Sequence, residues 1–404
     1  MKSSVDHTVA EGGRGFITNR EFDVVLCGAA GFVGRQTVAY FARHAPRDLR
    51  WAIAGRSLNK LESLQSNTPA IVFDSLNQRE VDALVARTRI ILSTAGPFRI
   101  YSDPLVNACV RIGTHYVDIS GETSRIRDLI DRYHDAAVNA RVRIVPFCGF
   151  SSTPADLAVY LLERRIGGQL VKANGFYQLG GGSFSGGTIA SIANAYTTGE
   201  AERERDPFLL NPDHRRVAHS IEKDPKGVRY NRMIRAWTSP SPMGVSDTRA
   251  VRRSGSLLGN EIIYQEYMEY PGLSGAFKAL GFHAVINLLN WMMRFEASRR
   301  FLQKTIPPGS GPNERAMDDG SFELRVIGSN GAGKQEEILL RGKGDAGNRI
   351  TTKCVCEAAL AAALNEASLP DVYGVLTPSV AFGEVLVRRL ESVGIEIKTR
   401  VVSI

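Results

Sequence analysis

The stretch "VVLCGAAGFVGRQTVAYFARH", residues 24–44, passes from an apolar run through a glycine-rich turn into an amphipathic segment. Its glycines have the spacing G-x-x-G-x-x-G, a variant of the dinucleotide-binding fingerprint. In that fingerprint the glycines permit a tight turn, close approach of a pyrophosphate and close packing of helix on strand. Amide groups at the start of the helix then face the anion. The residues expected to form this turn are Gly28, Ala30, Gly31, Phe32, Val33 and Gly34.

The segments around this turn alternate regularly between two patterns. Short runs rich in apolar and β-branched residues are separated by amphipathic runs of helical length. The runs of the first kind are "FDVVLC", "RWAIAG", "AIVFD", "RIILSTAG", "HYVDIS" and "RIVPFCGF". Such alternation predicts parallel βαβ units, so residues 21–155 are expected to form an α/β Rossmann domain with a doubly wound parallel sheet. Ligands of such sheets bind at the carboxyl ends of the strands, where the glycine turn lies.

The end of the second predicted strand indicates which dinucleotide binds. NAD-binding domains usually place Asp or Glu there to hold the ribose hydroxyls. In "AIAGRSLNK" these positions carry Arg56, Ser57 and Lys60, and the first carboxylate is Glu62. Because a planar guanidinium pairs well with phosphate, these residues predict NADP(H) as the cofactor. A solvent-facing arginine after a strand is the alternative.

Two further strand ends are expected to contact the cofactor. Asp74, which closes "IVFD", would lie near the adenine or would cap its own loop. "STAGPF" closes the fourth strand, and its residues Ala95, Gly96 and Pro97 would leave room for the ribose and the nicotinamide.

The composition fits a protein of two domains. The chain has 404 residues, of which 43% are hydrophobic and 23% charged, and its net charge is +8. This charge suits a phosphorylated cofactor or an anionic lipid surface, whereas the lack of basic blocks with interleaved aromatics argues against nucleic acid. Residues 1–20 lack the apolar core of a signal peptide and are expected to be a flexible tail of a cytoplasmic protein. Five cysteines, mostly in apolar runs and without zinc spacing, predict buried reduced thiols and no metal.

Residues 156–350 are expected to form a second, α+β domain. "QLVKANGFYQLGGG", "EIIYQEYMEY", "FELRVIGSN" and "QEEILLRGKG" show strand-like alternation, and the last two flank a glycine-rich loop that predicts a hairpin. "GGGSFSGGTIASIANAY" predicts a flexible entry into a helix. The charged stretch 199–229 is expected to be a mobile surface loop. A strong helix former, "ITTKCVCEAALAAALNEA", follows this domain.

Several motifs, taken in order, resemble those of a known family. They are "REFDVVLCGAAGFVGR", "AGRS", "STAGPF", "YVDISGE", "GGSFSGGTIAS", "PPGSGPNERAMDDGSF" and "YGVLTPSVAFGEVLVRRL". From about residue 20 to residue 404 the chain is similar to the trans-acting enoyl reductases of mycobacterial type, within the saccharopine-dehydrogenase-like group. "FSGGTIAS" and "GVLTP" are the narrowest of these markers. Two positions near the expected cleft depart from the family pattern: Ser151, where many relatives carry Asp, and Ser102, where relatives tend to have Gly.

The resemblance implies a Rossmann domain, an inserted α+β substrate domain and a C-terminal helical segment, 351–404, that packs back on the first domain. It also implies NADPH-dependent reduction of a carbon–carbon double bond in a polyketide-derived lipid intermediate, presented by a polyketide synthase. Two alternatives stay open. One is a saccharopine-type amino-acid dehydrogenase, and the other is a non-catalytic NADP-binding protein associated with lipid or membrane.

Few residues offer chemistry beyond that of the cofactor. Enoyl reduction needs a hydride, a proton and a donor that stabilises the enolate oxygen. Tyr101, just after "STAGPF", is the expected proton donor, or it packs on the cofactor with its hydroxyl satisfied. Asp118 of "YVDISGE" is the second catalytic candidate, or it caps the next helix, and Glu122 closes the same motif. His115 is expected to be an edge residue of the sheet rather than a base.

Residues 271–300 form a mostly apolar segment with helical periodicity. Phe277, Leu288 and Trp291 fall on one line, and cations follow from Arg294 onward. Two asparagines, a histidine and a lysine make the segment a poor membrane span. It is expected to be buried in the second domain or at a homodimer interface, or else to cover the cleft or lie on a membrane. The last arrangement would place the protein peripherally at the inner face of the plasma membrane.

Overall fold

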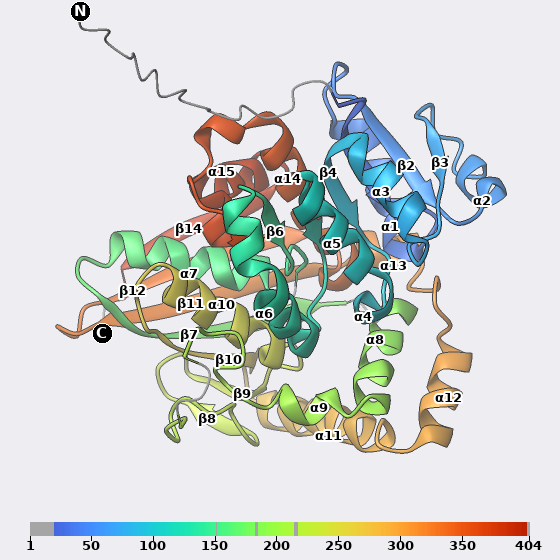
Figure 1. The fold of residues 1–404 in the computed structure, drawn as a ribbon. Helices are drawn as coiled ribbons and strands as arrows, with labels where there is room; N and C mark the ends of the chain where they lie inside the picture. Colours follow the sequence, from blue (N-terminus) through green and yellow to red (C-terminus); the bar gives the residue numbers. More distant parts are fainter. Residues whose placement is uncertain (1–19, 151, 182–184, 214–216, 402–404) are drawn as a thin grey trace, which may run out of the picture.

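Two seven-stranded β-sheets organise the residues that the computed structural model describes, 20–150, 152–181, 185–213 and 217–401 (Figure 1). The first sheet contains β1 (Phe22–Cys27), β2 (Trp51–Gly55), β3 (Ala70–Val72), β4 (Thr88–Ser93), β5 (His115–Asp118), β6 (Arg143–Val145) and β13 (Gly374–Val375). The second contains β7 (Leu170–Gly180), β8 (Arg229–Asn231), β9 (Ala236–Pro240), β10 (Ile263–Tyr270), β11 (Ser321–Asn330), β12 (Gln335–Lys343) and β14 (Ile395–Val401). The tail predicted for residues 1–20 lies, except for its last residue, outside the described residues.

The helices alternate with the strands of the first sheet and then surround the second. They are α1 (Phe32–His44), α2 (Leu58–Glu62), α3 (Gln78–Ala86), α4 (Phe98–Tyr101), α5 (Asp103–Ile112), α6 (Thr123–Asn139), α7 (Thr153–Arg165), α8 (Gly186–Thr197), α9 (Glu200–Arg203), α10 (Gly244–Leu257), α11 (Gly275–Met292), α12 (Glu296–Thr305), α13 (Glu314–Asp318), α14 (Thr351–Leu364) and α15 (Pro378–Ser392). A π turn, η1 (Ala346–Ile350), and a 3-10 turn, η2 (Glu366–Ser368), flank α14.

The first sheet is parallel throughout, in the order β13-β6-β5-β4-β1-β2-β3. Alternate strand residues enter different apolar clusters: Val24 and Leu26 of β1 point to one face, Val25 and Cys27 to the other. Helices α1 and α14 pack on the first face, and α3, α5 and α6 on the second. The predicted α/β fold with a doubly wound Rossmann sheet is confirmed, with β13 as an added edge strand.

The second sheet is mixed and shares a helix layer with the first. Its order is β14-β12-β11-β7-β10-β9-β8, with β7 and β10 parallel, and β11 and β12 form the predicted hairpin. Side chains of this sheet, among them Tyr177, Leu324 and Leu340, belong to the same apolar cluster as one face of the first sheet. Helices α7, α14 and α15 lie within that cluster, between the two sheets (Figure 1). The C-terminal segment 351–404, which is predicted to be helical, also contributes a strand to this sheet, because β14 pairs with β12.

The charged stretch 199–229 is packed against the protein over much of its described length. Leu209 and Leu210 are buried, although charge density predicts a mobile surface loop. Three buried arginines of α10 donate hydrogen bonds to main-chain carbonyls of this stretch: Arg249, Arg252 and Arg253. The mobile-loop prediction was wrong because these partners lie 43–45 residues further along the chain.

The apolar segment 271–300 forms two helices rather than one, because α11 ends at Met292 and α12 begins at Glu296. Within α11 only Gly275 and Ala279 are buried, so the helix is not part of the core of the second domain. Among the described helices, none combines the length and the apolar character that crossing a membrane requires.

All five cysteines are buried and free, as predicted for reduced thiols. Within the described ranges, no three His, Cys, Asp or Glu side chains gather as a metal site would require.

Candidate functional site

The glycine turn between β1 and α1 has the geometry of a phosphate cradle. Gly28 has φ +80°, and a Cβ there would lie 2.9 Å from the Ala95 nitrogen. A Cβ at Gly34 would overlap the carbonyl oxygen of Gly28, so α1 approaches the turn as closely as its backbone allows. A side chain at Gly31 would meet only the Gly28 carbonyl oxygen, at 3.1 Å, and would otherwise occupy the open side of the turn. Gly28 and Gly34 are thus required by the backbone, whereas a side chain at Gly31 would crowd the open side of the turn.

The start of α1 offers unpaired donors to an anion. Gly31 is the N-cap residue, no side chain caps the helix, and its first turn holds no acidic residue. The first main-chain bond of the helix runs from the Arg35 N–H to the Gly31 carbonyl, 2.9 Å, which leaves the three preceding N–H groups without a helical acceptor. These groups and the helix dipole fit the pyrophosphate of a dinucleotide.

The second strand end places Arg56 beside Tyr101. The guanidinium carbon of Arg56 lies 5.5 Å from the centre of the Tyr101 ring, a cation–π contact. Ser57 is the N-cap residue of α2 and Lys60 is exposed on that helix, so the three predicted residues lie together at the end of β2. This contact places Tyr101 beside the residue that is predicted to distinguish NADP(H).

Asp74 adopts the loop-capping arrangement that the sequence left open. Its Oδ1 accepts a hydrogen bond from the Leu76 N–H, 3.0 Å. The carboxylate therefore stabilises the turn after β3 by an Asx interaction.

The residues after β4 are fixed by one carboxylate. Glu122 accepts hydrogen bonds from the N–H groups of Phe98, 2.9 Å, and Arg99, 2.8 Å, directly after the predicted Ala95–Pro97. It also accepts one from the Ser191 hydroxyl of α8, 2.6 Å. The motifs "STAGPF", "YVDISGE" and "FSGGTIAS" meet at this point, where α4 and α8 lie side by side (Figure 1). Glu122 thereby joins the start of α4 to α8 of the second domain.

A second contact between the domains lies over the glycine turn. Arg35 donates to the carbonyl of Ala30, 2.9 Å, and to that of Gly309, 3.3 Å. A Cβ at Gly311 would overlap the Phe32 ring, so the segment after α12 lies directly against the turn. The "PPGSGPN" motif thus packs directly on the glycine turn.

Asp118 lies in a buried ion pair. Its carboxylate accepts hydrogen bonds from the Tyr116 hydroxyl, 2.8 Å, the Ser120 N–H, 2.8 Å, and Arg125, 3.1 Å. Burial raises the pKa of Asp118, and the charge of Arg125 opposes that rise. Tyr116 lies in β5, Ser120 in the loop that follows and Arg125 in α6. The carboxylate therefore holds the loop after β5 in place.

Of three other residues that the sequence analysis names, two are buried within the first domain and one lies outside the described residues. Ser102 is fully buried and donates to the Phe98 carbonyl. His115 is buried at the start of β5, where its Nδ1 accepts from the Arg143 N–H, 3.0 Å, at the opposite sheet edge from the cofactor turn. Ser151 lies outside the described residues.

A buried carboxyl pair lies between α10 and the second sheet. Asp247 of α10 accepts from the Ser152 hydroxyl, 3.1 Å, and Glu266 of β10 accepts from the Tyr264 hydroxyl, 3.2 Å. Burial raises the pKa of Glu266 to about 7, and burial together with Glu266 raises the pKa of Asp247 well above its usual value. The pair therefore retains a proton near neutral pH. The sequence did not predict this pair, because neither carboxylate lies in a recognised motif and only the packing of α10 on β10 brings the two together.

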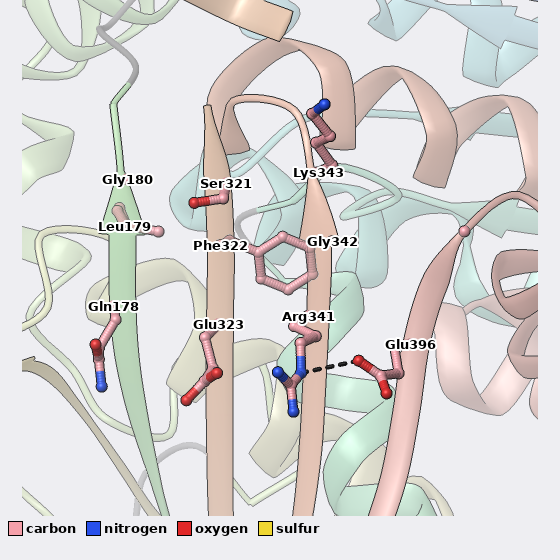
Figure 2. Close-up of a pocket in the computed structure, with 11 residues that line it drawn as sticks. Gln178, Leu179, Gly180, Ser321, Phe322, Glu323, Arg341, Gly342, Lys343 and Glu396 are labelled. Carbon is pink, nitrogen blue, oxygen red and sulfur yellow. Dashed lines mark ion pairs between the residues drawn. The ribbon is translucent and has the colours of Figure 1, made fainter. Parts of the chain in front are cut away.

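Figure 2 shows a different hollow, of about 550 Å³, at the ends of β7, β11, β12 and β14. Its charged lining is partly satisfied internally, since Arg341 pairs with Glu396 at 2.9 Å. None of the predicted cofactor residues lines it.

Comparison with known proteins identifies the family. The model of the saccharopine dehydrogenase NADP binding domain matches residues 24–145, which include the glycine turn and Arg56. A Mycobacterium tuberculosis protein named among the trans-acting enoyl reductases is 35% identical over 95% of this chain and 98% of its own. The trans-acting enoyl reductase of Mycobacterium bovis is 31% identical over 94% of this chain and 98% of its own. The chain belongs to the trans-acting enoyl reductase family.

Solved structures agree on the fold. Apo saccharopine dehydrogenase (L-Glu forming) from Saccharomyces cerevisiae aligns with a TM-score of 0.54 and 14% identity, covering 95% of this chain and 100% of that one. Homospermidine synthase from Legionella pneumophila aligns with a TM-score of 0.50 and 11% identity over 95% of this chain and 92% of that one.

As a member of this family with an NADP-binding domain, the protein is an NADP-dependent oxidoreductase. The match to the NADP binding domain model confirms the predicted cofactor, NADP(H).

Proposed function

We propose that this trans-acting enoyl reductase reduces the carbon–carbon double bond of a lipid-like enoyl thioester, a polyketide-derived intermediate presented by a synthase. The observation that carries the proposal is the open phosphate cradle in a chain related over nearly its whole length to proteins of that name. The term trans-acting supports a separate synthase that holds the substrate.

The residues around the cleft have distinct roles in this proposal. The first N–H groups of α1 and the open side of Gly31 hold the pyrophosphate, and Arg56 pairs with the phosphate that distinguishes NADP(H). When bound, NADPH supplies the hydride that enoyl reduction requires. Ala95, Gly96 and Pro97 leave room at the nicotinamide end.

We assign positioning roles to the two residues that the sequence nominates as catalytic. Tyr101 stacks on Arg56, and its place beside that guanidinium favours orientation of the phosphate-binding group over proton donation. Asp118 is enclosed by Tyr116 and Arg125 and sets the loop that leads to Glu122. Glu122 in turn holds residues 98–99 against α8.

The protein is proposed to work in the cytoplasm with peripheral contact at the inner face of the plasma membrane. The exposed apolar surface of α11 supports this contact.

Turnover by the full chain tests the proposed reaction. NADPH oxidation with an enoyl thioester on an acyl carrier protein, and a product that has gained two hydrogens by mass spectrometry, is the expected result. Saccharopine and NADP⁺ serve as the comparison. Turnover of saccharopine, or NADPH binding with neither reaction, would overturn the proposal.

A further inference from the structure

Helix α11 leaves an unusually large apolar surface in solvent. Of its 18 residues only Gly275 and Ala279 are buried, and Phe277 is 80% exposed. The exposed large apolar residues of α11 and its two flanks are Leu273, Phe277, Leu280, Val285, Leu288, Trp291, Phe295 and Phe301. Contiguous apolar surface of this kind marks an interaction site.

The position of this surface on the molecule is fixed. A Cβ at Gly275 would overlap the Tyr270 carbonyl oxygen, so the first turn of α11 lies against β10. At the other end, Met293 packs with Ile189 and Ala193 of α8, and Leu302 of α12 joins the same cluster. Figure 1 shows α11 along the lower edge of the molecule, with α8 and α12 beside it. Because α8 carries Ser191, which bonds to Glu122, the apolar surface adjoins the element that contacts the predicted cofactor region.

The charges of the segment that carries this surface are almost all positive. Residues 271–305 contain one carboxylate, Glu296, which pairs with Arg300. The cations of the same segment are Lys278, Arg294, Arg299, Arg300 and Lys304. A two-fold contact between copies would place this surface against itself, so its cations would face a surface with little negative charge to offset them. An anionic lipid surface complements both the charge and the apolar side chains, and Trp and Phe suit its interface.

We infer that α11 and the start of α12 dock on an anionic lipid bilayer, with the apolar side chains inserted at the interface and the cations against the headgroups. This gives the proposed peripheral membrane contact a defined surface. It also turns the α8 side of the cleft toward the membrane, from which a lipid-like chain could enter.

Cosedimentation of the full chain with vesicles tests this surface. Vesicles containing phosphatidylglycerol are expected to bind the protein at least tenfold better than pure phosphatidylcholine vesicles, since each cation near the surface adds about fivefold. Binding is expected to weaken as salt is raised.

Two variants separate the apolar and the charged contributions. Phe277→Ser with Leu288→Ser and Trp291→Ser should lower vesicle binding at least tenfold. Lys278→Gln with Arg294→Gln and Lys304→Gln should lower binding to anionic vesicles about tenfold or more and leave the weak neutral binding unchanged. The matched control changes three exposed apolar residues elsewhere, Val138→Ser, Leu258→Ser and Leu364→Ser, and should bind vesicles like the parent.

NADPH affinity without vesicles should be unchanged in all three variants, so this test is separate from that of the reductase chemistry. If the serine variant does not fold, the glutamine variant decides, because it keeps the apolar surface. Absence of binding by the parent to anionic vesicles would overturn the inference. So would a parent dimer that the serine variant converts to a monomer, because a second copy would then cover α11.

Discussion

At the scale of single residues, Arg56 should decide which nicotinamide cofactor binds. It follows β2 where an NAD-binding domain would place a carboxylate, and its guanidinium stacks on the Tyr101 ring. Arg56→Ala should weaken NADPH binding by roughly 1.5–3 kcal/mol and barely change NADH binding. Calorimetric titration with both cofactors measures this, and equal losses for the two would contradict the assignment.

Tyr101 should act through Arg56 rather than through its hydroxyl. Tyr101→Phe keeps the ring under the guanidinium, so both NADPH affinity and kcat should stay close to those of the parent. Tyr101→Leu removes the ring and should weaken NADPH binding by about 0.5–1 kcal/mol, the size of an exposed cation–π contact. A large fall of kcat in the Phe variant, with NADPH affinity intact, would instead identify Tyr101 as the proton donor.

At the scale of elements, α10 should control the stability of the stretch 199–229. Arg253 is buried and donates to the carbonyls of Leu210, 2.7 Å, and Val375, 2.6 Å, and burial lowers its pKa to about 9. Arg253→Met would leave both carbonyls without this donor and should lower the free energy of unfolding by about 2–4 kcal/mol. Urea denaturation measures the loss. Arg388→Met, at an exposed position of α15, is the control, and equal stability of the two variants would contradict this role.

The elements of the first sheet could be predicted from sequence because their determinants are local. Apolar runs bounded by glycine and polar residues mark β1, β2, β4 and β5, and the glycine spacing marks the turn before α1. The contacts that complete the site are not local. Glu122 meets Ser191 across 69 residues, and Gly311, which follows α12 in the chain, meets Phe32 at the start of α1. Only the fold brings these residues together, so no periodicity in the sequence marks them.

At the scale of the whole molecule, the two sheets share one helix layer, and charged groups inside it are costly. Glu266 and Asp247 lie there with Tyr264 of β10, Tyr177 of β7, and Ser152 and Asp156 at the start of α7. Burial raises the pKa of Asp156 to about 6 as well. Their hydrogen bonds within the described part of the chain come from neutral donors: the hydroxyls of Ser152, Ser254 and Tyr264 and the N–H of Ser379. The layer therefore favours their protonated forms.

This arrangement makes stability depend on pH in a definite direction. In the folded protein the Glu266–Asp247 pair holds a proton. The unfolded chain releases this proton above the ordinary glutamate pKa of 4.5. Because its pKa is raised, the contribution of Glu266 to stability is lost as pH rises from about 4.5 to about 7. Glu266→Gln removes one ionisation and should recover roughly 3 kcal/mol or less at pH 8, with little change near pH 5. Denaturant unfolding of parent and variant across this range measures the difference, with the exposed Glu391→Gln as control. Parallel pH profiles for parent and Glu266→Gln would show that the pair ionises in the folded protein without cost.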